Sequence, residues 1–204
     1  MAITINGDGT LTGISVGGLP DGIVDTDMLA TDAVSAAKLQ STAVTSGDLP
    51  TGSILQVIQT VKTSFFSTTT TDSWVDVTGV SVAITPASTS NKILLMCTGY
   101  TGNGNNDSFH HLRILRDSTS ISIGDARGSS TRSTMNGTLR AGGGSSGDVS
   151  RAFACHILDS PSTTSEVTYK LQMFITQGTP GCIGGSNGDT DDNRSSTPTF
   201  IPRS

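Results

Sequence analysis

The sequence predicts a mainly β protein in three parts: an extended N-terminal anchor, a short trimeric repeat stalk, and an antiparallel β-sandwich or jelly-roll head. Three observations carry this prediction. Helix formers are scarce, because glycine is abundant, Glu166 is the single glutamate and only 14% of the residues are charged. A ten-residue repeat occupies residues 21–50, and short apolar stretches that alternate with polar residues follow from Gly52 onward.

Charged and aromatic residues divide the chain near residues 50–52. Residues 1–50 carry six aspartates against a single lysine, whereas residues 51–204 carry eleven acidic and eleven basic side chains. All nine aromatic residues lie between Phe65 and Phe200. Only the second region therefore has the large side chains that a hydrophobic core needs.

The first region places one large apolar residue at every fifth position. On a continuous helix, residues five apart lie about 140° apart around the axis, which gives no apolar stripe. A continuous strand would put valines on one face and leucines on the other, with only small or polar residues between them. The repeated positions are Val24, Leu29, Val34, Leu39, Val44 and Leu49.

Short helical turns fit this repeat better. A residue that favours a helix N-cap follows each valine-type position, at Ser15, Asp25, Ser35 and Thr45. One-turn helices are unstable alone. Two apolar side chains per decad, at roughly 1.5–3 kcal/mol each, do not offset about 1–2 kcal/mol per ordered backbone residue. The segment is therefore either a disordered acidic linker or a rope of copies of itself, most simply three, and the regular period favours the rope.

The decads resemble repeats in fibre proteins of tailed bacteriophages, in the shafts of head fibres and of some tail fibres. The matching stretches are TDAVSAAKLQ and STAVTSGDLP. The resemblance implies a homotrimeric stalk of supercoiled short helical turns over residues 21–50.

The second region is predicted to form seven or eight short strands between clusters of Gly, Ser, Asn, Pro and Asp. In one of them the alternation is expected to run without interruption from Val75 to Ile84. Even spacing and the absence of long helical patterns indicate an antiparallel sandwich or jelly roll. The stretches are SILQVIQTVKT, WVDVTGVSVAITP, KILLMCTGY, FHHLRILRD with SISIGD, VSRAFACHILD, EVTYKLQMFITQ and TPTFIP.

Four phrases of this region resemble C-terminal domains of phage tail-fibre and virion structural proteins. They occur in the same order and span most of residues 52–175. The resemblance implies a trimeric β head at the distal end of a fibre. The phrases are GSILQVIQTVKT, VDVTGVSVAITPASTSNKILLM, LRILRDSTSISIGD and LDSPSTTSEVTYKLQ.

Residues 124–150 are rich in Gly and Ser and are predicted to form a long exposed loop that carries Arg127, Arg132 and Arg140. Exposed loops on rigid scaffolds bind ligands, and guanidinium groups can hold phosphates or anionic glycans by bidentate bonds. The alternative is an insertion whose charges only keep it soluble. Trp74 opens a strand, where it either stands exposed as a platform for a sugar or anchors the core.

No pattern indicates catalysis, a cofactor or a metal, so we expect no enzyme activity. Asp189, Asp191 and Asn193 have the 1-3-5 spacing of a calcium loop. Arg194 follows where an EF-hand needs glycine, and the later glutamate is absent, so a solvated loop is the better interpretation.

The histidines give no stronger signal. His110 and His111 are neighbours, so on a strand they face opposite ways and at most one can reach a trimer axis. His156 follows Cys155, and neighbours on a strand diverge in the same way, so chance explains this pair.

Several classes of partner are disfavoured. The net charge of −5, with arginines not interleaved with aromatics, disfavours nucleic-acid binding. There is no long apolar run for membrane insertion and no standard signal peptide at the N-terminus. The three cysteines, Cys97, Cys155 and Cys182, are expected to be reduced and partly buried thiols, as in a protein assembled in a cytosol.

Composition and resemblance together predict a virion protein assembled in the host cytoplasm. Residues 1–20 would anchor it by adding a strand to a capsid or tail protein. Residues 21–50 would form the homotrimeric stalk, and residues 51–204 a head that touches a host surface glycan weakly, with three heads adding avidity. The alternative is a capsid decoration or cement protein without receptor binding.

Overall fold

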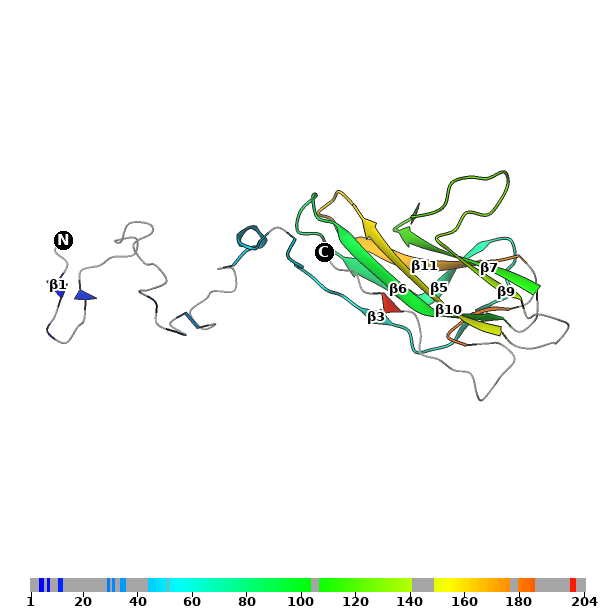
Figure 1. Cartoon of the computed structure of the whole chain (residues 1–204), viewed down its shortest axis with the longest axis horizontal. Coiled ribbons are helices and arrows are strands. Elements are labelled where there is room, and N and C mark those ends of the chain that lie inside the picture. Colours follow the sequence, from blue (N-terminus) through cyan, green and yellow to red (C-terminus); the bar gives the residue numbers. More distant parts are fainter. Residues whose placement is uncertain are drawn as a thin grey trace. The chain divides into compact units, whose positions relative to one another are not determined.

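The computed structural model describes most of the chain after residue 43. The chain divides into two units, Met1–Thr51 and Gly52–Ser204 (Figure 1). Each unit is described by itself. The described residues are 4–5, 7, 11–12, 29, 31, 34–35, 44–50, 52–103, 107–140, 149–176, 180–185 and 199–200.

The first unit contains one small hairpin and one helical turn. Strand β1 (Thr4–Ile5) pairs antiparallel with β2 (Leu11–Thr12). The turn is a 3-10 helix, η3 (Ser46–Asp48), and Thr45 is its N-cap. The Asp48 carboxylate accepts hydrogen bonds from Thr45 N and Thr45 Oγ1, both at 2.7 Å. These bonds hold the pKa of Asp48 below its usual value. The predicted helical turn after Thr45 is confirmed.

The apolar stalk positions that the structure describes are exposed. Leu29, Val34, Val44 and Leu49 have between 40% and 55% of their surface accessible. Val24 and Leu39 lie outside the described residues. In the single chain these four apolar side chains are therefore open to solvent over about half of their surface.

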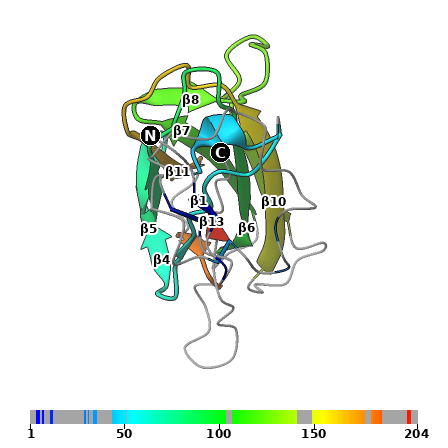
Figure 2. The same cartoon turned by 90° about the vertical axis from the view of Figure 1, so that its left-hand side faces the viewer.

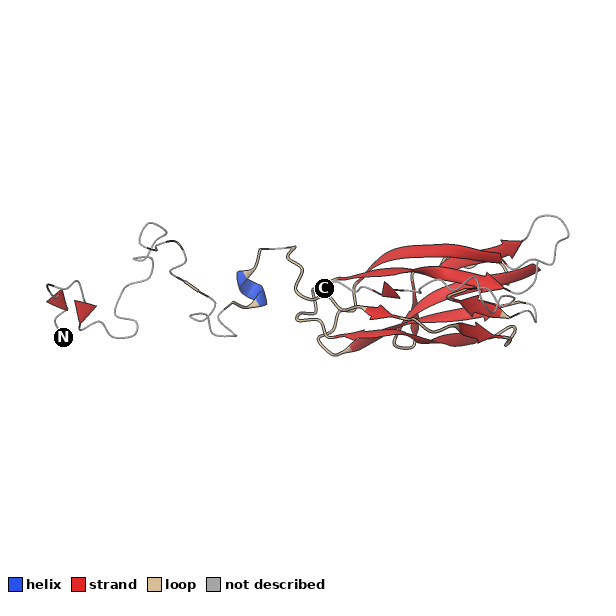
Figure 3. Ribbon diagram, turned by 90° about the horizontal axis from the view of Figure 1, so that it is seen from below, coloured by secondary structure: helices blue, strands red, loops and turns tan. Residues whose placement is uncertain are grey.

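The second unit is a sandwich of two antiparallel sheets (Figures 2 and 3). We name them the β6 sheet and the β11 sheet after the strand at the centre of each. This arrangement confirms the predicted mainly β, antiparallel sandwich. The β6 sheet has the order β3 (Thr60–Val61), β13 (Thr199–Phe200), β6 (Ile93–Asn103), β12 (Gly181–Ile183) and β4 (Phe66–Thr68), with β10 (Val149–Asp159) paired to β6. Strand β10 pairs with β6 at all eleven of its residues, and it pairs with no other strand among the described residues.

The β11 sheet faces the β6 sheet across the core. The β11 sheet has the order β5 (Trp74–Ile84), β11 (Val167–Ile175), β7 (Asp107–Arg116) and β8 (Thr119–Ile121), with β9 (Met135–Arg140) also paired to β7.

The core lies between the two sheets and follows from strict alternation. Every second residue of β11 is buried, while the residues between them are half-buried on the outer face. This two-residue period is what a strand with one face on a core requires. The largest fully buried side chains are Tyr169, Ile84, Ile93, Leu95, Leu112, Ile114, Leu171, Met173, Ile175 and Ile183.

Some predicted elements differ from the observed ones. In the stretch SILQVIQTVKT only Thr60–Val61 is a strand. Strand β9 lies inside the stretch 124–150, so the prediction of one continuous loop there is wrong. The sequence MNGTLR is short and has only two large apolar residues, Met135 and Leu139, on either side of Gly137. It becomes a strand because β7 offers it a paired edge over six residues.

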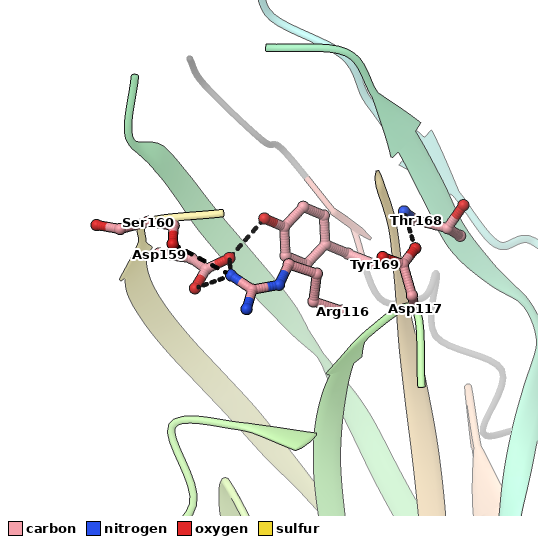
Figure 4. A network of polar contacts seen from close by, with 6 residues as sticks. All are labelled: Arg116, Asp117, Asp159, Ser160, Thr168 and Tyr169. Atoms are coloured by element: carbon pink, nitrogen blue, oxygen red, sulfur yellow. Dashed lines mark hydrogen bonds and ion pairs between the residues drawn. The ribbon is translucent and has the colours of Figure 1, made fainter. Parts of the chain in front are cut away.

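A polar network ties the two sheets together at one end of the sandwich (Figure 4). Arg116 Nη1 on β7 donates to both carboxylate oxygens of Asp159 on β10, at 3.0 and 2.8 Å. The hydroxyl of Tyr169 on β11 donates to Asp159 Oδ2 at 2.7 Å. Burial, followed by the bond to Asp159, raises the pKa of Tyr169 well above its usual value. One carboxylate thus joins three strands from both sheets.

Two of the cysteines face each other inside the β6 sheet. Cys97 on β6 lies directly opposite Cys155 on β10. Cys97 and Cys182 are buried and Cys155 is half-buried, as expected from the sequence. The hydrogen bond between the Cys97 and Cys155 side chains and burial together raise the pKa of Cys97. No helix among the described residues is long and apolar enough to cross a membrane.

Candidate functional site: the outer face of the β11 sheet

A bulge in β5 decides which side chains reach the outer face of the β11 sheet. Lys170 lies opposite Ser81, but Gln172 lies opposite Asp76, so five residues of β5 span two of β11. Strand β5 thus has three more residues than β11 over this stretch. Because side chains alternate between the two faces of a strand, an odd number of extra residues exchanges the inward and outward positions of β5 across the bulge. Gly79 sits in the bulge with a φ of +83°, in the region that favours glycine. Asp76 and Trp74 are thereby placed on the outer face.

The sequence carries a signal for this bulge. The β-branched apolar residues of β5 fall on odd positions before Thr78-Gly79, at Val75 and Val77, and on even positions after it, at Val80, Val82 and Ile84. The prediction of unbroken alternation from Val75 to Ile84 is therefore wrong at Gly79. The buried residues confirm the exchange: Val77, Val80, Val82 and Ile84.

A row of four side chains crosses four strands on this face. Trp74 on β5 is opposite Phe174 on β11, Phe174 is opposite His111 on β7, and His111 is opposite Asn136 on β9. The ring centroids of Trp74 and Phe174 lie 5.3 Å apart, and those of His111 and Phe174 lie 5.9 Å apart edge to face. His111 Nδ1 and Ser133 Oγ each lie 2.6 Å from Asn136 Oδ1.

A second row of polar side chains runs beside the first. Asp76, Gln172 and Arg113 lie opposite one another on β5, β11 and β7. Gln172 Nε2 donates to Asp76 Oδ1 at 2.5 Å, and Arg113 Nε donates to Gln172 Oε1 at 2.8 Å. Lys170 Nζ donates to Asp76 Oδ2 at 2.8 Å. The Arg113 guanidinium also lies over the Trp74 ring, 4.1 Å from its centroid.

We call these side chains together the Trp74 face. The hydrogen bond from Lys170 is the main reason that the pKa of Asp76 lies below its usual value, so the carboxylate is ionised at neutral pH. Partial burial lowers the pKa of Arg113, and the charge of Asp76 opposes that effect. The residues of the Trp74 face are Trp74, Asp76, His111, Arg113, Asn136, Lys170, Gln172 and Phe174.

The Trp74 face suits recognition by hydrogen bonds and stacking. Aromatic rings, a guanidinium, an amide and a carboxylate stand close together on rigid strands, which fixes their directions. Hydroxyl-rich ligands such as sugars need such groups (an expectation of general recognition chemistry). No serine, cysteine or histidine on this face is paired with a base that would make it a nucleophile.

The predicted arginines are only partly brought together. Arg127 and Arg132 are exposed in the connection between β8 and β9, and Arg132 Nε donates to Gly124 O at 2.6 Å. Arg140 instead belongs to β9, opposite Asp107. The three arginines therefore do not form one loop cluster as predicted. The connection joins the Trp74 face through Ser133, which bonds Asn136.

The sequence identified Trp74 but missed its neighbours. The structure places the Trp74 side chain half-buried on the outer face, rather than in the core or fully exposed at a loop tip. Arg113 and Phe174 are 39 and 100 positions further along the chain, and only strand register brings them to Trp74. Alternation within each strand identifies their outward direction, but it does not give register.

A cavity of about 360 Å³ lies at the side of the sandwich where β9 and β10 approach each other. Its polar lining residues include Asn136, which also belongs to the Trp74 face. His110 lies inside the head and contacts Thr101, which lines the cavity: His110 Nδ1 is 3.2 Å from Thr101 Oγ1. The other ring nitrogen of His110, Nε2, lacks a partner among the described residues. Burial lowers the pKa of His110 to about 4. The lining is Thr101, Leu112, Met135, Asn136, Arg151, Ala152 and Phe153.

Neither metal candidate gains support. Within the described ranges no three His, Cys, Asp or Glu side chains lie close enough to hold a metal ion. Asp189, Asp191 and Asn193 lie outside those ranges. His110 and His111 do face opposite ways, His110 into the core and His111 onto the Trp74 face.

Comparisons with known proteins give little further guidance. No protein-family model matches the chain, and no curated protein matches it. Among solved structures, it is similar to a chain of "Structure of infectious bursal disease virus Gx strain", with 12% identity and a TM-score of 0.29. The match covers 72% of this chain but only 35% of that one. A similarity at this level supports no inference about function.

Proposed function

We propose that this chain is a virion structural protein of a bacteriophage, a short homotrimeric fibre that displays its β head at the particle surface. The observation that carries the proposal is the repeat in residues 21–50, whose described apolar side chains stay exposed in the single chain. Isolated exposed leucines and valines are ordinary. Valines and leucines that recur every five residues are explained together if copies of the chain wrap around one axis.

In such a fibre, the other parts of the chain have distinct roles. Residues 1–20 attach the fibre to a capsid or tail protein. The head projects outward, and its Trp74 face is the surface we assign to contact with a host surface glycan. Its rigid donors and acceptors favour that role, and Arg127 and Arg132 in the adjoining connection add positive charge suited to anionic sugars.

Oligomer mass tests the fibre. We expect light scattering of the full chain to give three times 20.9 kDa. A monomer at micromolar concentration would overturn the proposal, because the repeat would then be a linker.

Binding to purified lipopolysaccharide and to a panel of bacterial surface polysaccharides tests the host contact. The double variant Gln172→Ala with His111→Ala should lose at least tenfold in affinity, because it removes hydrogen-bonding groups from the centre of the Trp74 face. The matched control, Ser81→Ala on the outer side of β5, should bind as the wild type does. Equal binding by both variants would remove the Trp74 face from the proposal.

A capsid decoration protein is the second candidate, and one observation favours it. Arg113 already lies over the Trp74 ring, and Asp76, Gln172 and Lys170 satisfy one another, so this face is complete without a ligand. Such a protein would bind empty capsids and raise their melting temperature, with no affinity for polysaccharide or cells. Capsid binding by residues 1–20 alone, with no cell binding by the full chain, would decide for this candidate.

A further inference from the structure

The outer face of β6 and β10 has a composition unlike that of the rest of the head. Between Leu94 and Tyr100 of β6, four directly opposed pairs point outward from these two strands, and none contains Asp, Glu, Lys or Arg. We call this surface the β6–β10 face. Its pairs are Leu94 with Leu158, Met96 with His156, Thr98 with Ala154, and Tyr100 with Ala152.

Much of the β6–β10 face is open to solvent. Leu158 is 62% exposed and Tyr100 is 41% exposed. Thr98, Ala152, Ala154 and His156 are also exposed, while Leu94 and Met96 are half-buried. A continuous uncharged surface with large apolar side chains on two neighbouring strands is typical of an interaction site rather than of a surface made only for water.

Charge indicates which partner fits. Residues 51–204 hold eleven acidic and eleven basic side chains, yet none of the eight side chains of this face is among them. A nucleic acid, an anionic glycan or a charged protein surface would find no complementary charge there. A second copy of the same face presents no like charge to repel it, and apolar contact needs no matching charge.

An independent observation indicates the same partner. Outside the head, Leu29, Val34, Val44 and Leu49 are also exposed in the single chain. At the start of the second unit, the same holds for Ile54, Val57 and Val61. Assembly with copies of this chain would cover apolar residues in both units, because every copy brings the same set.

We propose that the β6–β10 face is the surface through which each head packs against a second copy of this chain. This inference rests on the proposed fibre, since it names the head contact of the same oligomer. In a symmetric assembly each copy presents the same rows of Leu158, Tyr100 and their neighbours to the interface.

The test uses the full chain with Leu158→Lys, and Ser81→Lys on the outer side of β5 as the matched control. Both side chains are exposed in the single chain, so neither substitution disturbs a packed core. We expect Leu158→Lys to raise the concentration at which the oligomer dissociates at least tenfold, as measured by light scattering across a dilution series. The Ser81→Lys variant should dissociate as the wild type does. Circular dichroism checks that the β structure is retained.

The outcomes separate the inference from the fibre proposal. Ala154→Lys places the charge at another row and serves as a second variant if Leu158→Lys fails to fold. A wild-type oligomer that neither lysine weakens would overturn the head interface while leaving the fibre in place. A wild-type monomer would overturn both. A wild-type oligomer weakened by both lysines, but not by Ser81→Lys, supports the inference.

Discussion

The two outer faces of the head differ in how they meet water. On the Trp74 face, charged and polar side chains bond one another from strand to strand. The β6–β10 face has no Asp, Glu, Lys or Arg, and leaves Leu158 and Tyr100 exposed. Both faces cover the same core, so core packing does not explain the contrast. The polar groups of the first face are paired within a single chain, whereas the second face is the one we propose to be covered by another copy.

The network on the Trp74 face contributes little to stability. The ion pair of Lys170 with Asp76 has side chains that are 31% and 52% exposed. Pairs this exposed typically contribute about 0–1 kcal/mol to the free energy of unfolding. The main effect of the network is therefore to hold side chains in fixed directions, as the proposed binding surface requires. Four experiments test this contrast.

The largest effect is expected where the two sheets are joined. Asp159→Ala removes the acceptor of both Arg116 and Tyr169, and should lower the free energy of unfolding by about 2–3 kcal/mol. Urea unfolding followed by circular dichroism measures it. Asp125→Ala in the exposed connection is the control and should change little. A loss below about 0.5 kcal/mol would mean that each sheet is held by its core alone.

A similar effect is expected from acid, through the interior that both faces share. The folded-state pKa of His110 is about 4, below the value of about 6.5 for an unfolded chain. The stability that His110 contributes is therefore present above pH 6.5 and is lost as the pH falls from 6.5 through 4. The full loss is on the order of 3 kcal/mol. Urea unfolding at pH 7 and at pH 4.5 should show a smaller difference for His110→Gln than for the wild type, and equal differences would exclude His110 as the cause.

A smaller effect is expected at the bulge that creates the Trp74 face. Gly79→Ala forces a side chain into a left-handed conformation and should cost about 1–2 kcal/mol. A Cβ there would meet Lys62 Nζ only at 3.6 Å, so backbone strain is the main term. Gly124→Ala, where no atom lies within 4 Å of the added Cβ, is the control. A neutral Gly79→Ala would show that the bulge tolerates other backbone geometries.

The smallest effect is expected on the Trp74 face itself. Asp76→Asn removes the ion pair with Lys170 and should lower the free energy of unfolding by about 0.5 kcal/mol at pH 7. Because the pKa of Asp76 is lowered, its contribution is present above pH 3.8 and is lost as the pH falls through the folded value. The wild type and Asp76→Asn should therefore converge as the pH falls below the folded-state pKa of Asp76. A loss above about 2 kcal/mol at pH 7 would show that this network is structural, which would remove the contrast drawn above.

The sequence predicts those parts of the fold that depend on local pattern. EVTYKLQMFITQ alternates except at Phe174, and its residues Val167–Ile175 form a strand with alternate residues buried. Thr45 is a cap residue at a regular repeat, and a helical turn follows it. Strand β9 was not predicted, because it is defined by its pairing with β7, which lies far away in the sequence. Gly137 pairs with His110, 27 positions earlier, and Asn136 pairs with His111, 25 positions earlier.

The candidate site was predicted only at Trp74. Its outward direction depends on an odd bulge at Gly79, and its neighbours depend on the register of three strands. Arg140 was grouped with Arg127 and Arg132 because they lie close in sequence, but a strand carries it away from them. Sequence patterns identify the face of a strand on which a residue lies, whereas tertiary pairing decides which residues lie next to it.

Strand β10 has a further consequence for how this protein is produced. Its register with β6 is unbroken over eleven residues, and its only Asp, Glu, Lys or Arg side chains, Arg151 and Asp159, lie near its two ends. Long, regular edge strands without internal lysine, proline or a bulge are templates for uncontrolled cross-β growth. Under the assembly proposed above, newly synthesised chains therefore have two competing fates, orderly assembly and aggregation. The concentration of unassembled heads in the cell would then set the yield of soluble protein, and slow expression would favour the ordered product.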